Sequence, residues 1–382
     1  MDFTLTKEQE LLRDGLAKFL TNRYELESSR AAAKTGEGWQ PKIWRSFAEE
    51  LGILGATLPE ADGGIGGGPV ELMIVTEALG HALVIEPFVD TVVFGAGLLQ
   101  RAGGAQAMAV LEKIVEGETI TAFAATEPTS GPDFNDVSTT ARRDGDAYII
   151  DGAKVVVSSA PIADHLLVTA RTAGSQRDED GISLFLVAFD AAHPPAGVEV
   201  HSYRTIDDRR AADLVFTEFR VPAEALLGAE GQAWESIARA VDEATAAVSS
   251  EAVGLMRKVL TDTVEYAKQR QQFGQTIGSF QALQHRMVDM YMELEQSIAA
   301  VYLAILHLDG DPVERALAVS AAKATIGRSA RFIGQNAVQL HGGMGMTEEL
   351  AIGHYFKRLT AIEYEFGSAD QHIARYAALT RA

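Results

Sequence analysis

Cysteine is absent from the sequence, and so are long apolar runs and an excess of basic charge. A chain without cysteine forms no disulfide, has no catalytic thiolate and binds no metal through sulfur. No apolar run approaches the roughly 18 residues that span a bilayer, and the start, Met1-Asp2-Phe3-Thr4, has no basic segment before an apolar one. The formal net charge of −20 opposes binding to nucleic-acid phosphates, which requires a basic surface. We therefore expect a cytoplasmic protein that binds neither nucleic acid nor membrane.

The hydrophobic period changes twice along a chain that is long enough for two or three domains. Residues 1–118 show the helical period, and Thr6 and Gln9 have the spacing of a capping box at the first helix. Residues 119–228 contain short β-rich runs separated by turn signals. Residues 229–382 return to long helical patterns typical of a bundle. We expect an N-terminal α-helical domain (1–118), a middle β domain (119–228) and a C-terminal α-helical bundle (229–382).

The same patterns predict the individual elements. Helices are expected at residues 44–54, 70–81, 105–115, 232–269, 281–308, 312–338 and 363–379. Strands are expected at residues 120–125, 147–151, 154–158, 165–170, 183–189 and 213–219. Because the strands follow one another without intervening helices, a parallel Rossmann sheet is not expected.

Three short motifs occur in order on this pattern. They are Thr-Glu-Pro-Thr-Ser-Gly-Pro-Asp at residues 126–133, Tyr-Ala-Lys-Gln-Arg-Gln-Gln-Phe-Gly at 266–274 followed by Phe-Gln-Ala-Leu-Gln-His at 280–285, and Gln-Leu-His-Gly-Gly-Met-Gly-Met at 339–346. Together they resemble the acyl-CoA dehydrogenase family. The resemblance covers essentially the whole chain, from Asp2-Phe3 onwards.

The side chains in these motifs suit an anionic ligand with an aromatic part. Arg270 offers a fork of donors to a diphosphate, and Phe273 offers a ring face for stacking; on a helix the two would share a face. Gly342 and Gly343 allow positive φ and let backbone N–H groups approach phosphate oxygens. Each residue also has a structural interpretation: Arg270 in a surface ion pair, Phe273 in the core, and the glycines in a helix C-cap turn.

The resemblance implies an α+β fold with an N-terminal α-helical domain, a middle β-barrel or sandwich and a C-terminal four-helix bundle. It implies FAD as cofactor and an acyl-CoA thioester as substrate, which is dehydrogenated to the trans-2-enoyl-CoA while the electrons pass to an electron-transfer flavoprotein. In the family, the segment that carries Arg270 reaches across a subunit interface, so a homotetramer or heterotetramer is expected. By resemblance, FAD contacts are expected from Phe123, Ala125, Thr126, Gly131, Pro132, Val156, Ser158, Arg270, Phe273, Gln281, Gln339, Gly342, Gly343 and Ser368.

Two positions near the flavin depart from the family pattern. Val156 stands where the family often has a tryptophan over the flavin edge, although Ser158 keeps a hydroxyl that can donate a hydrogen bond. Pro132 stands where a serine is usual, which removes a hydroxyl and an N–H. The resemblance therefore implies a flavin that is held differently or more weakly.

The base that takes the α-proton is also unusual. The two family positions for it align with Phe366 and Ala244, and neither side chain accepts a proton. Glu251 lies two helical turns after Ala244 on the same helical face, in a small-residue stretch where desolvation favours the protonated carboxyl. We therefore take Glu251 as the leading base, before Glu243, which is rotated by about 100°, and Glu365, which is shifted one residue from Phe366. The alternative for Glu251 is an ion-paired helix residue.

The remaining features concern metals and partners. His285, His341 and His354 share no ligand spacing, so no metal is expected and each is expected to orient a neighbour. Residues 339–349 and 354–358 resemble a subgroup described as small subunits, such as those of pimeloyl-CoA and steroid side-chain dehydrogenases, which pair with a homologous chain. The main alternative to an autonomous enzyme is therefore a catalytically silent subunit that completes another chain's FAD site. An oxygen-using flavoenzyme on the same fold is a weaker alternative.

Overall fold

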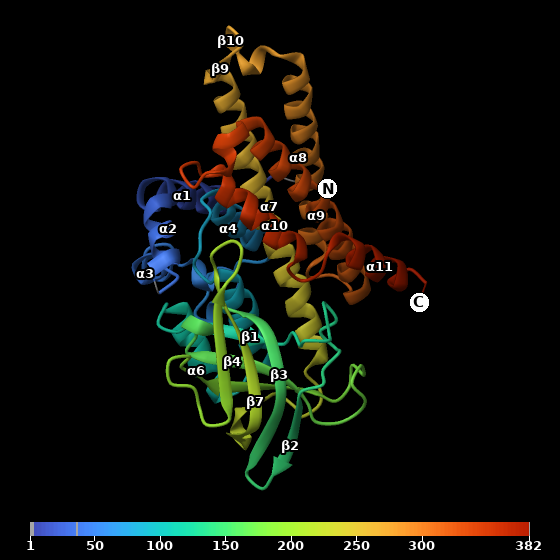
Figure 1. Ribbon diagram of the computed structural model, residues 1–382. Coiled ribbons are helices and arrows are strands. Elements are labelled where there is room, and N and C mark those ends of the chain that lie inside the picture. Colours follow the sequence, from blue (N-terminus) through green and yellow to red (C-terminus); the bar gives the residue numbers. More distant parts are fainter. Residues whose placement is uncertain (1–3, 36, 382) are drawn as a thin grey trace. The chain divides into compact units, whose positions relative to one another are not determined.

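Helices, then strands, then helices follow one another in the computed structural model, which describes residues 4–35 and 37–381 (Figure 1). This order confirms the expected α+β fold class. Asp2 and Phe3, where the family resemblance starts, lie outside the described residues. The described parts of Met1–Ser29, Pro69–Val84 and Thr245–Ala382 form one compact unit, and those of Arg30–Gly68 and Ile85–Ala244 form a second. The expected division into three domains stays a prediction.

The N-terminal third is helical, as expected, although the helix expected at 44–54 ends at Glu49 and only a short 3-10 turn at Ile53–Gly55 follows it, because Gly52 has a positive φ. Its α-helices are α1 (Lys7–Arg23), α2 (Leu26–Thr35), α3 (Pro41–Glu49), α4 (Pro69–His81), α5 (Gly97–Ala102) and α6 (Ala105–Val115). The capping box at the start of α1 is confirmed, because Thr6 Oγ1 accepts a hydrogen bond from Gln9 N at 3.3 Å and Gln9 Oε1 accepts one from Thr6 N at 2.9 Å.

Between α4 and α5 lies a π-helical segment, η3 (Val89–Ala96), that the sequence does not predict. Nearly all of its residues are buried, so no polar face interrupts the apolar run and no amphipathic period marks it. Single π turns inside helices are often found at functional sites. This segment contacts β1 of the middle part of the chain, within the second unit.

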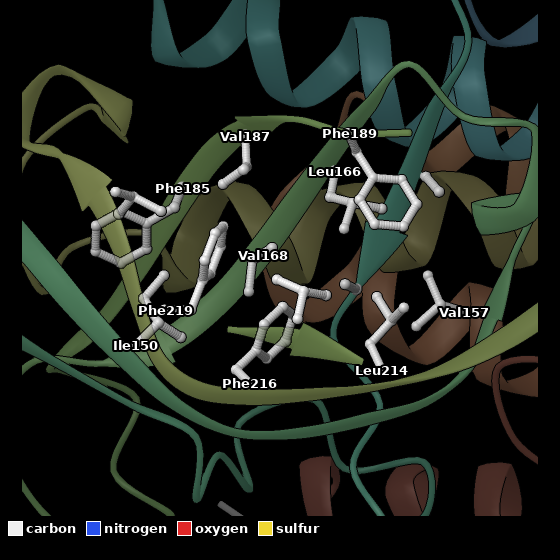
Figure 2. Packing of buried hydrophobic residues seen from close by; sticks show 14 of the residues in the cluster. Ile150, Val157, Leu166, Val168, Phe185, Val187, Phe189, Leu214, Phe216 and Phe219 are labelled. Atoms are coloured by element: carbon white, nitrogen blue, oxygen red, sulfur yellow. The ribbon is translucent and has the colours of Figure 1, made fainter. Parts of the chain in front are cut away.

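The strands form a largely antiparallel sheet, so the expectation of a sheet that is not of the parallel Rossmann type is confirmed. Its strands are β1 (Thr121–Ala124), β2 (Thr140–Asp144), β3 (Ala147–Ser158), β4 (His165–Arg171), β5 (Ile182–Ala188), β6 (Val198–Arg204), β7 (Arg210–Pro222) and β8 (Leu226–Leu227), in the spatial order β6-β7-β3-β2-β4-β5-β8 with β1 parallel to β4. The sheet surrounds an apolar core that includes Phe185, Phe216 and Phe219 (Figure 2).

Some strand expectations need correction. The two strands expected at 147–151 and 154–158 are one strand, β3, because Gly152 and a bulge let the chain bend without ending its pairing with β7. Strands β2 and β6 were not expected, since their exposed faces carry charged and polar side chains that hide the alternation. Pairing with a neighbouring strand, rather than local hydrophobicity, defines them.

The C-terminal part is helical. Its helices are α7 (Trp234–Gln269), α8 (Gln281–His307), α9 (Pro312–His341), α10 (Ile352–Tyr364) and α11 (Ala369–Leu379), with a short hairpin of β9 (Gln271–Gln272) and β10 (Gln275–Thr276) between α7 and α8. Helix α9 packs against α8, α10 and α11. The helix expected at 363–379 is broken, because Phe366 and Gly367 have positive φ and Ser368 starts α11 with its own capping box.

Candidate functional site

The first motif is a loop that a buried carboxylate holds in place. Glu127 follows β1 and is almost completely buried. Its carboxylate accepts hydrogen bonds from Ser138 N at 2.8 Å and Thr139 N at 3.0 Å, in addition to an ion pair with Lys154 at 2.7 Å. The Glu127 side chain therefore fixes the loop through contacts with the two residues just before β2 and with Lys154 of β3.

Lys154 is the second half of this anchor. Its Nζ is fully buried and donates hydrogen bonds to Ala125 O at 3.2 Å, Glu127 Oε1 at 2.7 Å and Thr169 Oγ1 at 2.9 Å. Burial lowers the pKa of Lys154 to about 8, although the charge of Glu127 acts in the opposite direction. Burial alone would raise the pKa of Glu127, but the charge and hydrogen bonds of Lys154 outweigh it and lower that pKa to about 2.

The pKa of Glu127 predicts how stability depends on pH. Since the pKa falls from 4.5 to about 2 on folding, the ionised carboxylate contributes stability that is fully present above pH 4.5 and lost as the pH falls through 2. We expect the free energy of unfolding to fall less over this range in Glu127→Gln than in the wild-type chain. Urea unfolding at a series of pH values measures the difference. Parallel pH profiles of the two proteins would contradict the prediction.

The expected flavin contacts near this loop are of two kinds. Phe123 packs between Phe94 and Phe134, with ring centroids 4.7 Å and 6.3 Å away, and Ala125 is buried. Their side chains therefore pack within the protein and shape the loop. Gly131 has a φ of 56° and an exposed surface, and Pro132 follows it at the same turn.

Val156 has an uncommon backbone conformation. It has a φ of 52° and a side chain that is 56% exposed, although valine is β-branched and rarely adopts positive φ. Its N–H donates to Asp213 Oδ1 at 2.9 Å. Ser158, two residues on, pairs with Ala211 of β7. Strained backbone of this kind is concentrated at ligand and catalytic sites.

The second motif is not helical at its centre, which corrects the expectation that Arg270 and Phe273 share a helix face. Helix α7 ends at Gln269, and β9 and β10 pair across a two-residue turn made of Phe273 (φ 55°) and Gly274 (φ 82°). Positive φ at both central residues is typical of the tight hairpin turn that matches strand twist. Phe273 is 90% exposed, so its interpretation as a core residue is wrong.

Arg270 precedes this turn and is exposed. Within residues 4–35 and 37–381 its guanidinium forms no ion pair, so the interpretation as a surface ion pair is wrong as well. Gln281 is the first residue of α8 and is also exposed. The segment 270–281 therefore exposes a cation at Arg270, an aromatic ring at Phe273 and an amide at Gln281.

The third motif ends α9. Gly342, with a φ of 59°, caps the helix through its N–H to Gln339 O, as the C-cap interpretation expects. A Cβ at Gly342 or Gly343 would meet no atom within 4 Å, so the backbone there is open to a ligand. Gln339 is exposed. His341 is buried, donates from Nδ1 to Ala337 O at 2.8 Å and stacks on Tyr266.

Two of the three expected bases lie around one buried arginine. Arg358 of α10 donates from Nε and Nη2 to the two oxygens of Glu251, both at 2.7 Å. Its Nη1 lies 3.0 Å from Glu365 Oε2. Glu251 is thus an ion-paired helix residue, as its alternative interpretation states. It is not the isolated buried carboxyl that the small-residue stretch suggests, because Arg358 binds both of its oxygens.

Glu243 belongs to the other compact unit and is also paired. It accepts from Arg101 Nη1 at 3.0 Å and from Arg239 Nε at 2.8 Å. Ser368, an expected flavin contact, uses its side chain as the N-cap of α11. The Lys323 ammonium is buried and donates to Glu363 O at 3.1 Å and Gly367 O at 2.7 Å, which fixes the turn that contains Glu365 and Phe366.

Sequence reasoning missed Lys154, Asp213, Lys323 and Arg358. A lysine in the apolar strand run at 154–158 signals a buried partner, so Lys154 was detectable. Glu251, which accepts two hydrogen bonds from Arg358, lies 107 residues away in the chain, and no local pattern indicates this pair. No helix of the described chain is long and apolar enough to cross a membrane. The same residues contain no cluster of three or more potential metal ligands.

Comparison with known proteins places this geometry in a family. Models of the N-terminal, middle and C-terminal domains of acyl-CoA dehydrogenases match residues 6–118, 122–219 and 231–378. The chain belongs to the acyl-CoA dehydrogenase family. This family comprises FAD-dependent oxidoreductases that act on acyl-CoA, so the expected enzyme class and cofactor are confirmed.

Individual relatives cover nearly the whole chain. Acyl-CoA dehydrogenase FadE12 of Mycobacterium tuberculosis is 32% identical over 92% of this chain and 90% of its own length. Butyryl-CoA dehydrogenase from Megasphaera elsdenii has a TM-score of 0.87 and 26% identity, with 100% of both chains covered. A chain of the ChsE4-ChsE5 complex from Mycobacterium tuberculosis has a TM-score of 0.88 and 26% identity, with 100% of this chain and 99% of that chain covered.

Proposed function

We propose that this chain binds FAD through the three motifs and uses it to dehydrogenate an acyl-CoA thioester at the α and β carbons. The main support is the exposed pair on the α7–α8 hairpin, where Phe273 is 90% exposed and Arg270 forms no ion pair with any described residue. Exposing an aromatic ring in a left-handed backbone conformation costs free energy. An aromatic ligand group that stacks on Phe273 would offset this cost, and a diphosphate on the same ligand would pair with the Arg270 guanidinium.

The other motifs fit the same cofactor. The open backbone at Gly342 and Gly343 can approach phosphate oxygens, since no Cβ blocks it. In the second unit, the loop anchored by Glu127 presents main-chain groups to a flavin ring. The strand that carries Val156 presents the hydroxyl of Ser158, which can donate a hydrogen bond to the ring. Bound FAD would supply the acceptor for the hydride from the β carbon. The protein must then provide a base for the α-proton.

We propose Glu365 as that base and rank it ahead of Glu251. Both oxygens of Glu251 accept from Arg358, whereas only Oε2 of Glu365 lies near that guanidinium. Within the described chain, Glu365 Oε1 accepts no hydrogen bond, and this oxygen can receive a proton. Glu365 also adjoins Phe366, the residue at the family's base position. A carboxylate in this place can act as general base while Arg358 limits its movement.

Arg270→Ala should weaken FAD retention. The change removes a charge-assisted diphosphate contact worth roughly 1.5–3 kcal/mol, which corresponds to a rise of about 10- to 150-fold in the FAD dissociation constant. Flavin content after dialysis and fluorescence titration of the apoprotein measure it. Arg142→Ala, which removes an exposed arginine of β2, is the matched control and should retain FAD. Equal flavin content in both variants would rule out the role of Arg270.

A tetramer, of one chain or of two homologous chains, is our proposal for the assembly. The hairpin tip with Phe273 has only Phe280 as a ring neighbour within the described chain, at 6.2 Å. Helix α8 also exposes Val288, Tyr291 and Met292, which lie on one face at helical spacing. Apolar surfaces of this kind mark protein interfaces. The related ChsE4-ChsE5 structure is itself described as a complex.

A silent partner subunit is the alternative function. The observation that favours it is that Glu243, Glu251 and Glu365 are all paired with arginines, while the usual base position holds Phe366. Such a chain would contribute Arg270, Phe273 and Gln339 to the FAD site of a homologous chain. Its own site would have no base to remove the α-proton of the substrate.

Purification of the chain alone distinguishes the two functions. We expect a yellow protein whose flavin absorbance bleaches when a member of an acyl-CoA panel is added without oxygen. The electrons should then pass to an added electron-transfer flavoprotein. Bleaching that occurs only after a homologous chain is added would establish the partner role instead. Peroxide release with each turnover would identify an oxygen-using enzyme.

A further inference from the structure

Two bulges in the pairing of β3 with β7 are held by aspartates. The register shifts once between Ile150 and Gly152 and again between Lys154 and Val157. At the first shift, Asp151 Oδ1 accepts from Glu218 N at 2.7 Å, and Glu218 has a φ of 48°. At the second, Asp213 Oδ1 accepts from Val156 N at 2.9 Å. Each carboxylate thus binds the N–H of a residue in the left-handed region on the opposite strand.

The second bulge has a further contact. Tyr203 of β6 donates from its hydroxyl to the same Asp213 Oδ1 at 2.8 Å. Burial, followed by the hydrogen bond and charge of Asp213, raises the pKa of Tyr203 to about 12. Three adjacent strands, β6, β7 and β3, therefore meet at one carboxylate oxygen.

The conformation that this oxygen holds is costly. Among the described residues with positive φ, Val156 is the only β-branched one, and its side chain is 56% exposed, so packing does not compensate for the strain. The strand around it faces the first motif, because Val155 N donates to Thr126 O at 2.9 Å. The strain is therefore located beside the loop that we assign to the flavin.

We propose that Asp213 and Tyr203 are positioning residues that hold the Val156 bulge in the shape that receives the flavin. The proposal rests on the function proposed above. Asp213 need not hold the fold, since it is not among the core residues of β7, which include its neighbours Ala212 and Leu214. Hydrogen bonds at partly exposed sites contribute little to global stability. The contribution of Asp213 is therefore local, to the backbone at Val156.

The first test compares two aspartate variants. Asp213→Ala should raise the FAD dissociation constant about tenfold, as expected for loss of a charged acceptor, and shift the visible absorption bands of the bound flavin. Asp151→Ala is the matched control, because it releases the other bulge of the same strand pair. It should leave both flavin readouts unchanged. Equal effects of the two variants would show a general role in the sheet and overturn the proposal.

The second test is a rescue. Glycine adopts positive φ without strain, so Val156→Gly should need no carboxylate to hold the bulge. In the Asp213→Ala background, Val156→Gly should restore most of the lost affinity. A double variant no better than Asp213→Ala would overturn the proposal. A wild-type chain that does not bind FAD would instead contradict the proposed function, and this outcome is seen before any variant is made.

Tyr203→Phe completes the series. It removes one donor to Asp213 and leaves the contact with Val156 N. We expect a smaller rise in the FAD dissociation constant, about threefold, with a spectral shift in the same direction as that of Asp213→Ala. An unchanged spectrum in Tyr203→Phe would remove Tyr203 from the proposal and leave Asp213 alone.

Discussion

Glu365→Gln is expected to slow the reduction of bound flavin by acyl-CoA about 10²- to 10⁴-fold, the contribution typical of a general base. The amide keeps the size of the side chain and removes its ability to take a proton. Rapid-mixing measurement of flavin bleaching, in the assembly that bleaches as wild type, gives the rate. Flavin content should stay unchanged, because Glu365 lies outside the three motifs.

Glu251→Gln is the informative comparison. It breaks a buried bidentate pair with Arg358, so its main effect should be a loss of stability of about 3–5 kcal/mol. A variant that melts like wild type, keeps its flavin and no longer bleaches would identify Glu251 as the base instead. If neither change affects bleaching in an active assembly, the base belongs to Glu243 or to the partner chain.

Lys154→Met should strongly destabilise the protein. It leaves Glu127 buried without its cation and removes the donor to Ala125 O. Breaking one partner of a buried pair costs about 3–5 kcal/mol. Urea unfolding followed by circular dichroism measures the loss.

Two variants sharpen this prediction. Lys154→Met combined with Glu127→Gln should recover part of the stability, since no buried charge is then unpaired. Lys258→Met, which breaks an accessible pair with Asp262 on α7, should change stability by less than about 1 kcal/mol. A loss in Lys154→Met as small as in Lys258→Met would show that the anchor contributes little.

The sequence was sufficient where one local signal dominates. Helix α4 is an apolar segment that begins at a proline, helix α6 has an apolar period, and the capping box at Thr6 is a short-range contact. Three ordered motifs were sufficient for the family. These features need no knowledge of distant residues.

Other features depend on contacts that cross the chain. Phe273 looks like a core residue until Gly274 and the pairing of β9 with β10 make the turn. Glu251 looks like an isolated carboxylate in a small-residue stretch until α10 brings Arg358 to it. Helical phase predicts the face on which a side chain lies, but not the residue that packs against that face.

The turn at residues 365–367 has an evolutionary consequence. Lys323 binds the carbonyls of Glu363 and Gly367, and His372 Nε2 donates to Phe366 O at 3.0 Å. These contacts fix the turn through main-chain oxygens, which every amino acid possesses. Apart from β-branched residues, which the φ of 59° at Phe366 disfavours, the side chain at 366 can therefore change over generations while the turn persists. After a gene duplication, one copy could keep a carboxylate here and the other lose it, and both would still fold.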